Sequence, residues 1–278
     1  MSDQVDMGCN ELHDRYELIR RLGKGGMADV FLAKRVTDGM QVAIKVLRPE
    51  FTRTMGREMF HREIALLKSL DHPNILPLLE SGEQRERLCF ISPYADGGSL
   101  ADRFNEGVHL DPEGAVKLAR QIAAALDYAH QQNVVHRDIK PGNVLFLEDR
   151  IVLCDFGVAR AIIRSGGEGL SSSGLLVGTP HYMSPEQASG VSKLDGMSDV
   201  YSLACVVYEA LMGEPVFDGP SAAAVLRKHR GASPPSLRVV KPELPEHVEK
   251  AVHAALEKKP ADRPKSANEF VDMLEGMG

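Results

Sequence analysis

Length, composition and charge exclude several classes of protein. The chain has 278 residues, of which 43% are hydrophobic, so it can bury a sizeable core in one large domain or in two joined lobes. A formal net charge of −6 argues against a nucleic-acid-binding surface and against attraction to anionic membranes. The four cysteines form no CxxC pair, a usage that suits a reducing cytosol and argues against a structural zinc site.

The first ten residues and the longest apolar stretch do not resemble export or anchoring signals. Residues 1–10 hold two aspartates and no basic residue, unlike a signal peptide. The longest mostly apolar stretch, 203–212, has about half of the ~20 residues that a membrane helix requires, and Glu209 interrupts it. We therefore expect a cytoplasmic protein with no membrane segment in this chain, and a polar lead-in over residues 1–15.

From Tyr16 to about Pro93 the sequence predicts a strand-rich region. Short β-branched or apolar segments alternate there with glycine-containing turns. The predicted strands are Tyr16–Leu22, Val30–Arg35, Gln41–Leu47 and Leu88–Pro93, and one helix, about Met55–Leu70, interrupts them.

Beyond 96–98, which we interpret as a hinge, helical patterns dominate. Asp111 is a predicted N-cap, Pro112 takes the first helical position, and apolar residues then recur at helical spacing to about Gln132. Further helices are predicted at Ser198–Met212, Ser221–His229, Glu246–Lys258 and Ser266–Glu275. The fold class is therefore α+β: a small N-terminal β lobe with one main helix, about 16–95, and a larger, mostly helical C-terminal lobe, about 96–278.

A glycine-rich segment connects the first two predicted strands. Glycines let backbone N–H groups approach phosphate oxygens closely, although a flexible hairpin turn is an alternative on local grounds. A strand follows the segment rather than a helix, so it is neither a Walker loop nor a Rossmann turn. It consists of Leu22, Gly23, Lys24, Gly25, Gly26, Met27, Ala28, Asp29 and Val30.

Lys45 lies in the next, otherwise apolar, strand. It is either a solvent-facing lysine or a buried one, and a buried lysine needs a partner. Glu63 lies on the apolar stripe of the predicted helix and needs a cation there, whereas Glu58 has Arg62 at i+4 and is better explained as a surface ion pair. We therefore assign Glu63 to Lys45.

Three further motifs follow in the C-terminal part. With the glycine-rich segment and Val42-Ala43-Ile44-Lys45 they make five motifs in a fixed order. The three are His136-Arg137-Asp138 with Asn143 five residues later, Asp155-Phe156-Gly157, and Ser184-Pro185-Glu186. In this order, from about Tyr16 to Phe270, the chain resembles the eukaryotic-type (Hanks-type) serine/threonine protein kinases, and its Gly25-Gly26-Met27 run is similar to bacterial members.

The resemblance implies a bilobal protein kinase fold that uses ATP and Mg²⁺ to phosphorylate serine or threonine hydroxyls of proteins. It implies that Asp138 orients the acceptor hydroxyl and takes its proton, that Lys140 offsets charge on the phosphate, and that Asn143 and Asp155 hold magnesium. The implied ATP-binding residues are the glycine-rich segment with Ala43, Lys45, Glu63, Pro93, Ala95 and Leu145. Ala28 replaces the third glycine of the family's loop, so we expect slightly looser closure on ATP.

The resemblance also implies how the chain is controlled. The segment from Gly178 to Glu186 is similar to the part that positions a peptide in serine/threonine kinases, and we expect Thr179 to bond to the Asp138–Lys140 pair. Autophosphorylation in 155–186, through transient self-association, is expected near Arg137. A solvated serine run is the alternative. The candidate phosphosites are Ser171, Ser172, Ser173 and Thr179.

Several polar residues are expected to support the site rather than to react. By resemblance, Glu186 pairs with Arg263 and Asp199 braces the catalytic-loop backbone. His136 is expected to pack with Phe156, Leu67 and Leu78. The rival classes are a pseudokinase that serves as a binding scaffold and a tyrosine or dual-specificity kinase.

Overall fold

The computed structural model describes residues 14–26, 28–49, 64–84, 87–156 and 179–277. The described residues divide into two compact units. Unit 1 contains the chain up to Asp71 together with Ile75–Asp96, and unit 2 contains His72–Asn74 and the described chain from Gly97 onward.

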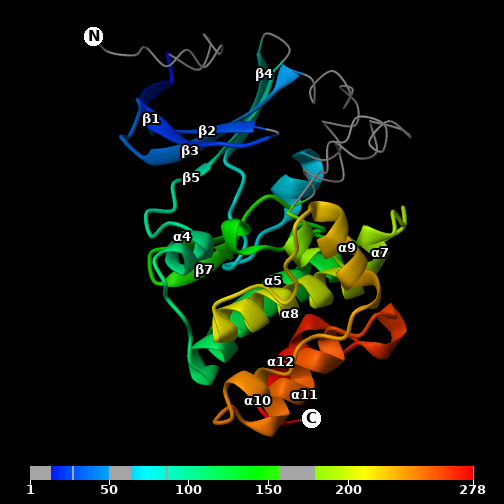
Figure 1. Cartoon of the computed structure of the whole chain (residues 1–278). Coiled ribbons are helices and arrows are strands. Elements are labelled where there is room, and N and C mark those ends of the chain that lie inside the picture. The colour runs from blue at the N-terminus through cyan, green and yellow to red at the C-terminus, as the bar shows by residue number, and fades with distance from the viewer. Residues whose placement is uncertain (1–13, 27, 50–63, 85–86, 157–178, 278) are drawn as a thin grey trace. The chain divides into compact units, whose positions relative to one another are not determined.

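Unit 1 is built on a five-stranded antiparallel sheet with the strand order β1-β2-β3-β5-β4 (Figure 1). The sequence predicts four of these strands. It misses β4 because the residues of that strand, ESGEQ, include no β-branched or aromatic side chain, and β4 pairs with β5 alone. The strands are β1 (Tyr16–Lys24), β2 (Ala28–Arg35), β3 (Gln41–Leu47), β4 (Glu80–Gln84) and β5 (Arg87–Pro93).

The two faces of this sheet have different roles because successive side chains alternate between them. One face forms a core of buried residues, namely Tyr16, Phe31, Ala33, Val42, Ile44, Val46, Cys89 and Ile91. The strand register pairs Val30 with Lys45 and Ala43 with Ser92. These four residues therefore share the face that is opposite to the core.

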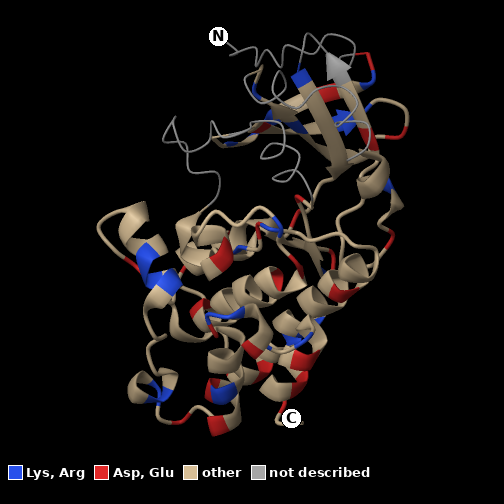
Figure 2. Cartoon of the chain, turned by 90° about the vertical axis from the view of Figure 1, so that its right-hand side faces the viewer, with Lys and Arg blue, Asp and Glu red and all other residues tan. Residues whose placement is uncertain are grey.

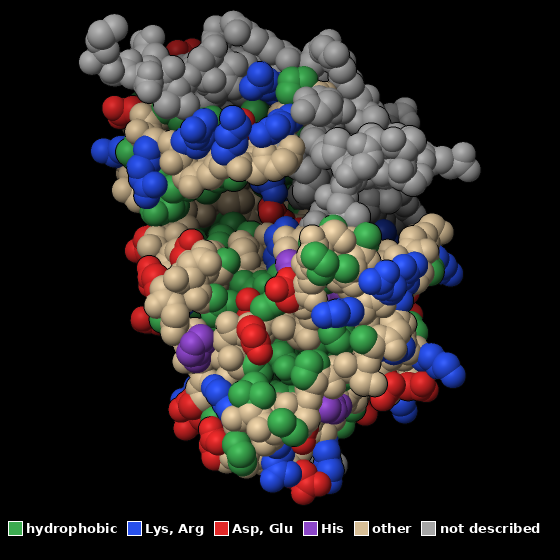
Figure 3. Space-filling model, viewed as in Figure 1, with side chains coloured by type: hydrophobic (Ala, Val, Ile, Leu, Met, Phe, Trp, Pro, Cys, Tyr) green, Lys and Arg blue, Asp and Glu red, His purple; other side chains and the backbone are tan. Residues whose placement is uncertain are grey.

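Basic side chains gather over the sheet of unit 1 (Figure 3). Arg20, Arg21 and Lys24 of β1 and Lys34 of β2 are all exposed. Arg15 and Arg35, by contrast, are paired with Glu80 and Asp38. The outer β1–β2 ribbon is therefore a hydrated surface of mainly positive charge.

The predicted helix of unit 1 is described only in part. Residues 64–69 are helical, and Ile64 and Leu70 are buried. The expected partner of Lys45, Glu63, lies outside the described residues.

Unit 2 is mostly helical, with one small β hairpin. The hairpin consists of β6 (Val144–Leu147) and β7 (Arg150–Leu153). The helices are α4 (Leu100–Asn105), α5 (Pro112–Gln131), α7 (Pro185–Ala188), α8 (Gly196–Met212), α9 (Ala222–Gly231), α10 (Leu237–Val240), α11 (Glu246–Ala255) and α12 (Ala267–Leu274), with the 3-10 turns η1 (Pro141–Asn143), η3 (Pro180–Tyr182) and η4 (Pro260–Asp262). The short helices α4, α7 and α10 are not predicted from the sequence. Across the described ranges, no helix is long and apolar enough to span a membrane.

Helix α8 is the centre of unit 2. It is apolar around nearly its whole circumference and buried along most of its length, as expected for a helix that other helices surround. Helices α5, α11 and α12 pack against it, and Figure 1 shows α5 and α8 running side by side. Gly213 ends α8 with a φ of 82°, a conformation that glycine adopts at little cost.

The predicted starts of three helices are correct, and a capping side chain sets each of them, but α8 begins at Gly196, two residues before the predicted Ser198, because Asp195 caps it by accepting from the N–H of Met197. Asp111 accepts a bond of 2.7 Å from the N–H of Gly114, and Ser221 and Ser266 cap α9 and α12 in the same way. Helix α11 ends at Ala255, earlier than the predicted Lys258. The reason is tertiary: the carbonyls of Glu257 and Lys258 accept bonds from the Arg263 side chain instead of continuing a helix.

Acidic and basic residues both occur across the helices of unit 2 (Figure 2). The last turn of α9 carries two residues of the same charge, Lys228 and Arg230. Positive charge at the C-terminal end of a helix interacts favourably with the helix dipole. We therefore explain the basic end of α9 by helix stability.

His229 makes the stability of unit 2 sensitive to acid. It is fully buried, and its Nδ1 lies 2.9 Å from the Tyr201 hydroxyl. Burial, and then the charge of Lys258, lower the pKa of His229 to about 4. Because the unfolded state then binds this proton more tightly, the unfolding free energy should fall by about 3 kcal/mol as the pH drops from 6.5 to 4. Above about pH 7.5 the residue contributes almost no pH dependence, because it is then neutral in both states.

Urea unfolding of wild type and His229→Gln at several pH values measures this contribution. Gln can still accept the Tyr201 bond but does not titrate. We expect a shallower loss of stability between pH 6.5 and 4 in the variant. Parallel pH profiles for the two proteins would contradict the assignment.

Candidate active site

The loop between α5 and η1 brings three of the predicted catalytic and metal residues together. The Lys140 Nζ lies 2.6 Å from Oδ2 of Asp138. Nδ2 of Asn143 donates to the same carboxylate oxygen at 3.0 Å and to the Asp138 carbonyl at 2.7 Å. Within the described part of the chain no hydrogen bond involves Oδ1 of Asp138. One carboxylate oxygen is thus held by two donors and the other is available to a substrate.

A buried aspartate of α8 fixes the backbone that precedes Asp138. Asp199 is fully buried, and its two oxygens accept from the N–H groups of His136 and Arg137, each at 2.8 Å. Its Oδ2 also lies 2.8 Å from Nε2 of His130. The predicted bracing role of Asp199 is confirmed, and His130 is a partner that the sequence did not reveal.

Burial and mutual attraction act in opposite directions on the pKa values of Asp199 and His130. Burial alone would raise the pKa of Asp199, but the hydrogen bond and charge of His130, with the backbone donors, hold it below its usual value. Burial opposes the proton on His130, but Asp199 outweighs burial and raises the pKa of His130. A side chain on Gly196 would place its Cβ 2.6 Å from Nδ1 of His130, so glycine is needed where α8 begins.

The backbone is strained at two residues of the site. Arg137 has a φ of 72° and Asp155 a φ of 67°. Non-glycine residues in this left-handed region each cost of the order of 1–3 kcal/mol, and such strain gathers at functional sites. Arg137 directly precedes the predicted base Asp138, and Asp155 is itself a predicted magnesium residue. The strained backbone therefore sets the directions of the side chains at these positions.

His136 connects the catalytic loop to the strand that leads to Asp155. Its Nδ1 accepts from the N–H of Asp138 at 3.3 Å, which leaves the proton on Nε2, and Nε2 donates to the Cys154 carbonyl at 2.9 Å. The Cys154 N–H in turn donates to the Asn143 carbonyl at 3.0 Å. His136 is therefore a neutral structural bridge.

The packing expected for His136 is confirmed in part. Its ring lies 4.4 Å from that of Phe156, centroid to centroid. Leu67 and Leu78 belong to unit 1, and their contact with His136 stays a prediction.

The predicted magnesium residues offer oxygen ligands without forming a cage. The described residues contain no group of three or more His, Cys, Asp or Glu side chains that could hold a metal ion. Both side-chain bonds of Asn143 use its nitrogen, so its amide oxygen remains for a ligand. Magnesium is usually bound by one or two side chains together with substrate phosphates. The side-chain oxygens of Asn143 and Asp155 match this mode of binding.

Unit 1 carries the predicted nucleotide residues except Leu145, which belongs to unit 2. The turn between β1 and β2 is closed by a 2.9 Å bond from the Gly25 N–H to the Ala28 carbonyl. Val30, Ala43 and Lys45 share one sheet face. Ala95 is buried, and its N–H has no hydrogen bond among the described residues, as expected if adenine is its acceptor.

Some predicted residues stay untested. Met27, Glu63 and Ser171–Ser173 lie outside the described residues, and Lys45 belongs to a different unit from Asp138, so their separation is not defined. One expectation is wrong. Thr179 is exposed, and its side chain makes no bond to Asp138 or Lys140 in the described structure.

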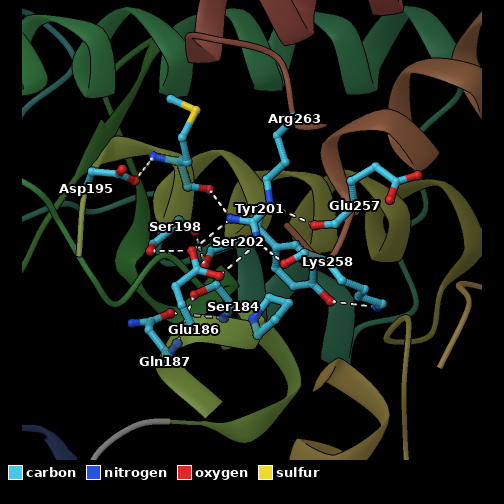
Figure 4. A network of polar contacts seen from close by, with 12 residues as sticks. Ser184, Glu186, Gln187, Asp195, Ser198, Tyr201, Ser202, Glu257, Lys258 and Arg263 are labelled. Atoms are coloured by element: carbon cyan, nitrogen blue, oxygen red, sulfur yellow. Dashed lines mark hydrogen bonds and ion pairs between the residues drawn. The ribbon is translucent and has the colours of Figure 1, made fainter. Parts of the chain in front are cut away.

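A buried ion pair fastens the segment after residue 178 to the helical core, as predicted. The Glu186 carboxylate and the Arg263 guanidinium make two parallel bonds of 2.8 Å (Figure 4). Ser198 donates to the same carboxylate at 2.6 Å. Burial would raise the pKa of Glu186, but Arg263 and then Ser198 hold it below its usual value.

Sequence reasoning missed two amide side chains that position the site. Asn74 donates to the Gln121 side chain at 3.1 Å and to the Ile151 carbonyl at 2.7 Å, and the Asn74 carbonyl accepts from Leu153 at 2.9 Å. Gln121 also accepts from the Ile151 N–H at 2.9 Å. These bonds hold β7, whose end leads to Asp155. No local sequence signal marks them.

The architecture is that of the protein kinase fold, and comparisons with known proteins agree. Residues 16–274 match the family described as "Protein kinase domain". The chain is 37% identical over 270 residues to serine/threonine-protein kinase pkn2 of Myxococcus xanthus, covering 95% of this chain and 32% of the relative. It is 36% identical over 258 residues to serine/threonine-protein kinase PrkC of Bacillus subtilis, covering 92% and 39%.

A solved structure extends the agreement to three dimensions. The PknI kinase domain of Mycobacterium tuberculosis has a TM-score of 0.73 and 29% identity, with 95% of this chain and 96% of that chain covered. The chain therefore belongs to the protein kinase family, in its bacterial serine/threonine group. It spans between 32% and 39% of the length of the two curated relatives above.

Proposed function

We propose that this chain transfers the γ-phosphate of ATP to serine or threonine hydroxyls of protein substrates. The observation that carries the proposal is the Asp138 carboxylate, which has one oxygen held by Lys140 and Asn143 and the other open to a hydroxyl. As the hydroxyl oxygen forms its bond to phosphorus and the bond to ADP breaks, the open oxygen takes the hydroxyl proton. Nothing in the mechanism requires Asp138 to move.

The nearby cations and amides stabilise the charge that is transferred. Lys140 lies beside the hydroxyl-activating carboxylate and offsets charge on the phosphoryl group. Asn143 and Asp155 supply the side-chain oxygens for Mg²⁺. When bound, this ion neutralises phosphate charge.

The nucleotide is assigned to residues of unit 1, with Leu145 of unit 2 added. The Pro93 carbonyl and the Ala95 N–H bind adenine, and the turn around Gly25 binds the phosphates through its backbone. Lys45, paired with Glu63, binds the α- and β-phosphates. The Ala95 N–H, which has no hydrogen bond among the described residues, and the shared face of Val30, Ala43 and Lys45 support this assignment.

The location and partners follow from composition and family. Protein substrates are favoured because residues 179–184 are similar to the segment that positions a peptide in serine/threonine kinases. A bond of 2.5 Å from the Tyr182 hydroxyl to Glu209 ties this segment to α8. The net charge of −6 argues against nucleic acid as a partner, and the widely spaced cysteines suit the cytoplasm.

An ATP-turnover assay tests the proposal. Purified protein with Mg²⁺, labelled ATP and a generic protein substrate should give phosphoserine and phosphothreonine, and chelation of divalent metal should stop the reaction. Phosphotyrosine alone would contradict the acceptor class. A wild-type protein that is inert with every substrate and with itself would favour the scaffold class.

Autophosphorylation is a further part of the proposal. In the sequence, Ser171, Ser172 and Ser173 precede the segment 179–184 and Thr179 begins it, and a phosphate on one of these residues can make charge-assisted bonds to arginine, for which Arg137 is the candidate. Mass spectrometry after incubation with ATP should find phosphate on at least one of the four. A triple Ser→Ala variant that keeps full activity, with no phosphate on Thr179, would count against this regulation.

A further inference from the structure

Gln187 connects two segments that the reaction requires. It lies on the short helix α7, just after the turn 179–184, and is half-buried. Its Oε1 accepts from the Ser184 N–H at 3.0 Å, and its Nε2 donates to the Arg137 carbonyl at 2.7 Å. Figure 4 shows its side chain beside Ser184. One planar amide therefore spans from the substrate-positioning segment to the catalytic loop.

The bond to Arg137 completes the restraint of a strained residue. The N–H of Arg137 is held by Asp199 at 2.8 Å, and its φ is 72°. The carbonyl of the same residue is the group that Gln187 holds. This carbonyl belongs to the peptide bond whose nitrogen is that of Asp138. The orientation of that peptide plane sets the direction in which the Asp138 side chain leaves the backbone.

We propose that Gln187 is a positioning residue for phosphoryl transfer, which aligns the Asp138 carboxylate by fixing the Arg137–Asp138 peptide plane. The inference rests on the proposed function, because it assumes that Asp138 accepts the hydroxyl proton. Gln187 does not touch substrate or nucleotide in this role. Its effect is transmitted through one backbone carbonyl.

The chemistry of the amide group is specific to this task. The Ser184 N–H needs an acceptor and the Arg137 carbonyl needs a donor, and a primary amide supplies both in one plane. A glutamate of nearly the same size keeps the acceptor for Ser184 but places a charged oxygen against the Arg137 carbonyl. Gln187→Glu therefore reverses one interaction while keeping the other and keeping the volume.

Steady-state kinetics of Gln187→Glu test the proposal. We expect kcat to fall roughly 10- to 100-fold, as for a small misplacement of a reacting group, with KM for ATP unchanged. Each kcat is divided by the fraction of protein that binds a non-hydrolysable ATP analogue, so that loss of folded protein is not counted. Gln187→Met, which removes both bonds without adding charge, should give a smaller decrease in the same direction.

Ser189→Ala is the matched control. The Ser189 hydroxyl donates to the Pro185 carbonyl at 2.8 Å within the same helix and has no role in the loop, so this variant should keep the wild-type kcat. An active wild type with unchanged corrected kcat in both Gln187 variants would overturn the inference. An equal decrease in Ser189→Ala would also overturn it, since general weakening of α7 would then explain the effect.

Hydrogen exchange separates this inference from the proposed function. Loss of the Gln187 bond should speed exchange of the His136 and Arg137 amides, whose acceptor is Asp199, whether or not the protein turns over ATP. If the wild type is inert but amide exchange is faster in Gln187→Glu, the proposed function is contradicted and the role of Gln187 in fixing the peptide plane is not. Unchanged exchange at both amides would overturn the positioning role.

Discussion

Asp138→Asn should lower kcat roughly 10²- to 10⁴-fold, the contribution expected of a positioned general base, while leaving the fold intact. The two donors that hold Oδ2, from Lys140 and Asn143, select the amide oxygen of the new side chain. The amide nitrogen then occupies the position of the open oxygen. A donor faces the substrate hydroxyl where an acceptor is required.

The structure of the loop predicts that this substitution is well tolerated. The new side chain has the same size and keeps both hydrogen bonds, and the backbone N–H of residue 138 still donates to His136. Thermal unfolding and affinity for an ATP analogue should therefore match the wild type. Single-turnover measurement at saturating ATP separates the chemical step from product release.

The comparison with wild type also separates the two functional classes. An active wild type and an Asn variant that keeps more than half of its kcat would contradict the role of Asp138 as base. If both proteins were equally inert, the chain would instead fit a binding scaffold with the same fold. The Asp138→Asn variant should keep a low residual activity, since substrate binding and electrostatic stabilisation of the transition state remain.

Residues that act within one short loop could be predicted from the sequence. Asp138, Lys140 and Asn143 lie within six residues of each other, and the resemblance assigned all three to one site; the structure shows that Lys140 and Asn143 both bond to the Asp138 carboxylate. Asp199 and Arg263 were anticipated by resemblance. Their contacts depend on tertiary structure, and the structure confirms them.

The missed features share a physical cause. His130 is one polar residue near the end of an amphipathic helix, and only packing against α8 shows that it faces Asp199. Gln187 completes a capping box with Ser184, which is visible in sequence, but its second bond to Arg137 is not. Strand β4 has no propensity of its own and exists because β5 offers it a partner.

Arg263→Met should destabilise the protein by about 3–5 kcal/mol, the cost of leaving a buried charge without its partner. All five N–H groups of Arg263 are used: two bond to the Glu186 carboxylate and the others to the carbonyls of Met197, Glu257 and Lys258. The Arg263 side chain is fully buried and that of Glu186 is only 12% exposed. Met fills similar volume but supplies none of these donors.

Urea unfolding of three variants distinguishes charge from packing. The double variant Glu186→Gln/Arg263→Met should be less destabilised than the sum of the two single variants, because the uncompensated carboxylate is gone. The exposed pair of Lys117 and Glu113 provides the control, since both side chains are more than two-thirds exposed. Lys117→Met should leave the midpoint nearly unchanged.

The pH dependence gives an independent check on Glu186. Arg263 helps to hold the pKa of Glu186 below its ordinary value, so the pair contributes stability above about pH 4.5 and loses it as the pH falls through the lowered pKa. Without Arg263, burial dominates and raises that pKa, so protonation of Glu186 should offset part of the stability that other groups lose in acid, and the difference in stability between the variant and wild type should narrow as the pH falls. An Arg263→Met protein as stable as wild type at pH 7, with the same acid profile, would show that this ion pair does not fasten the segment to the core.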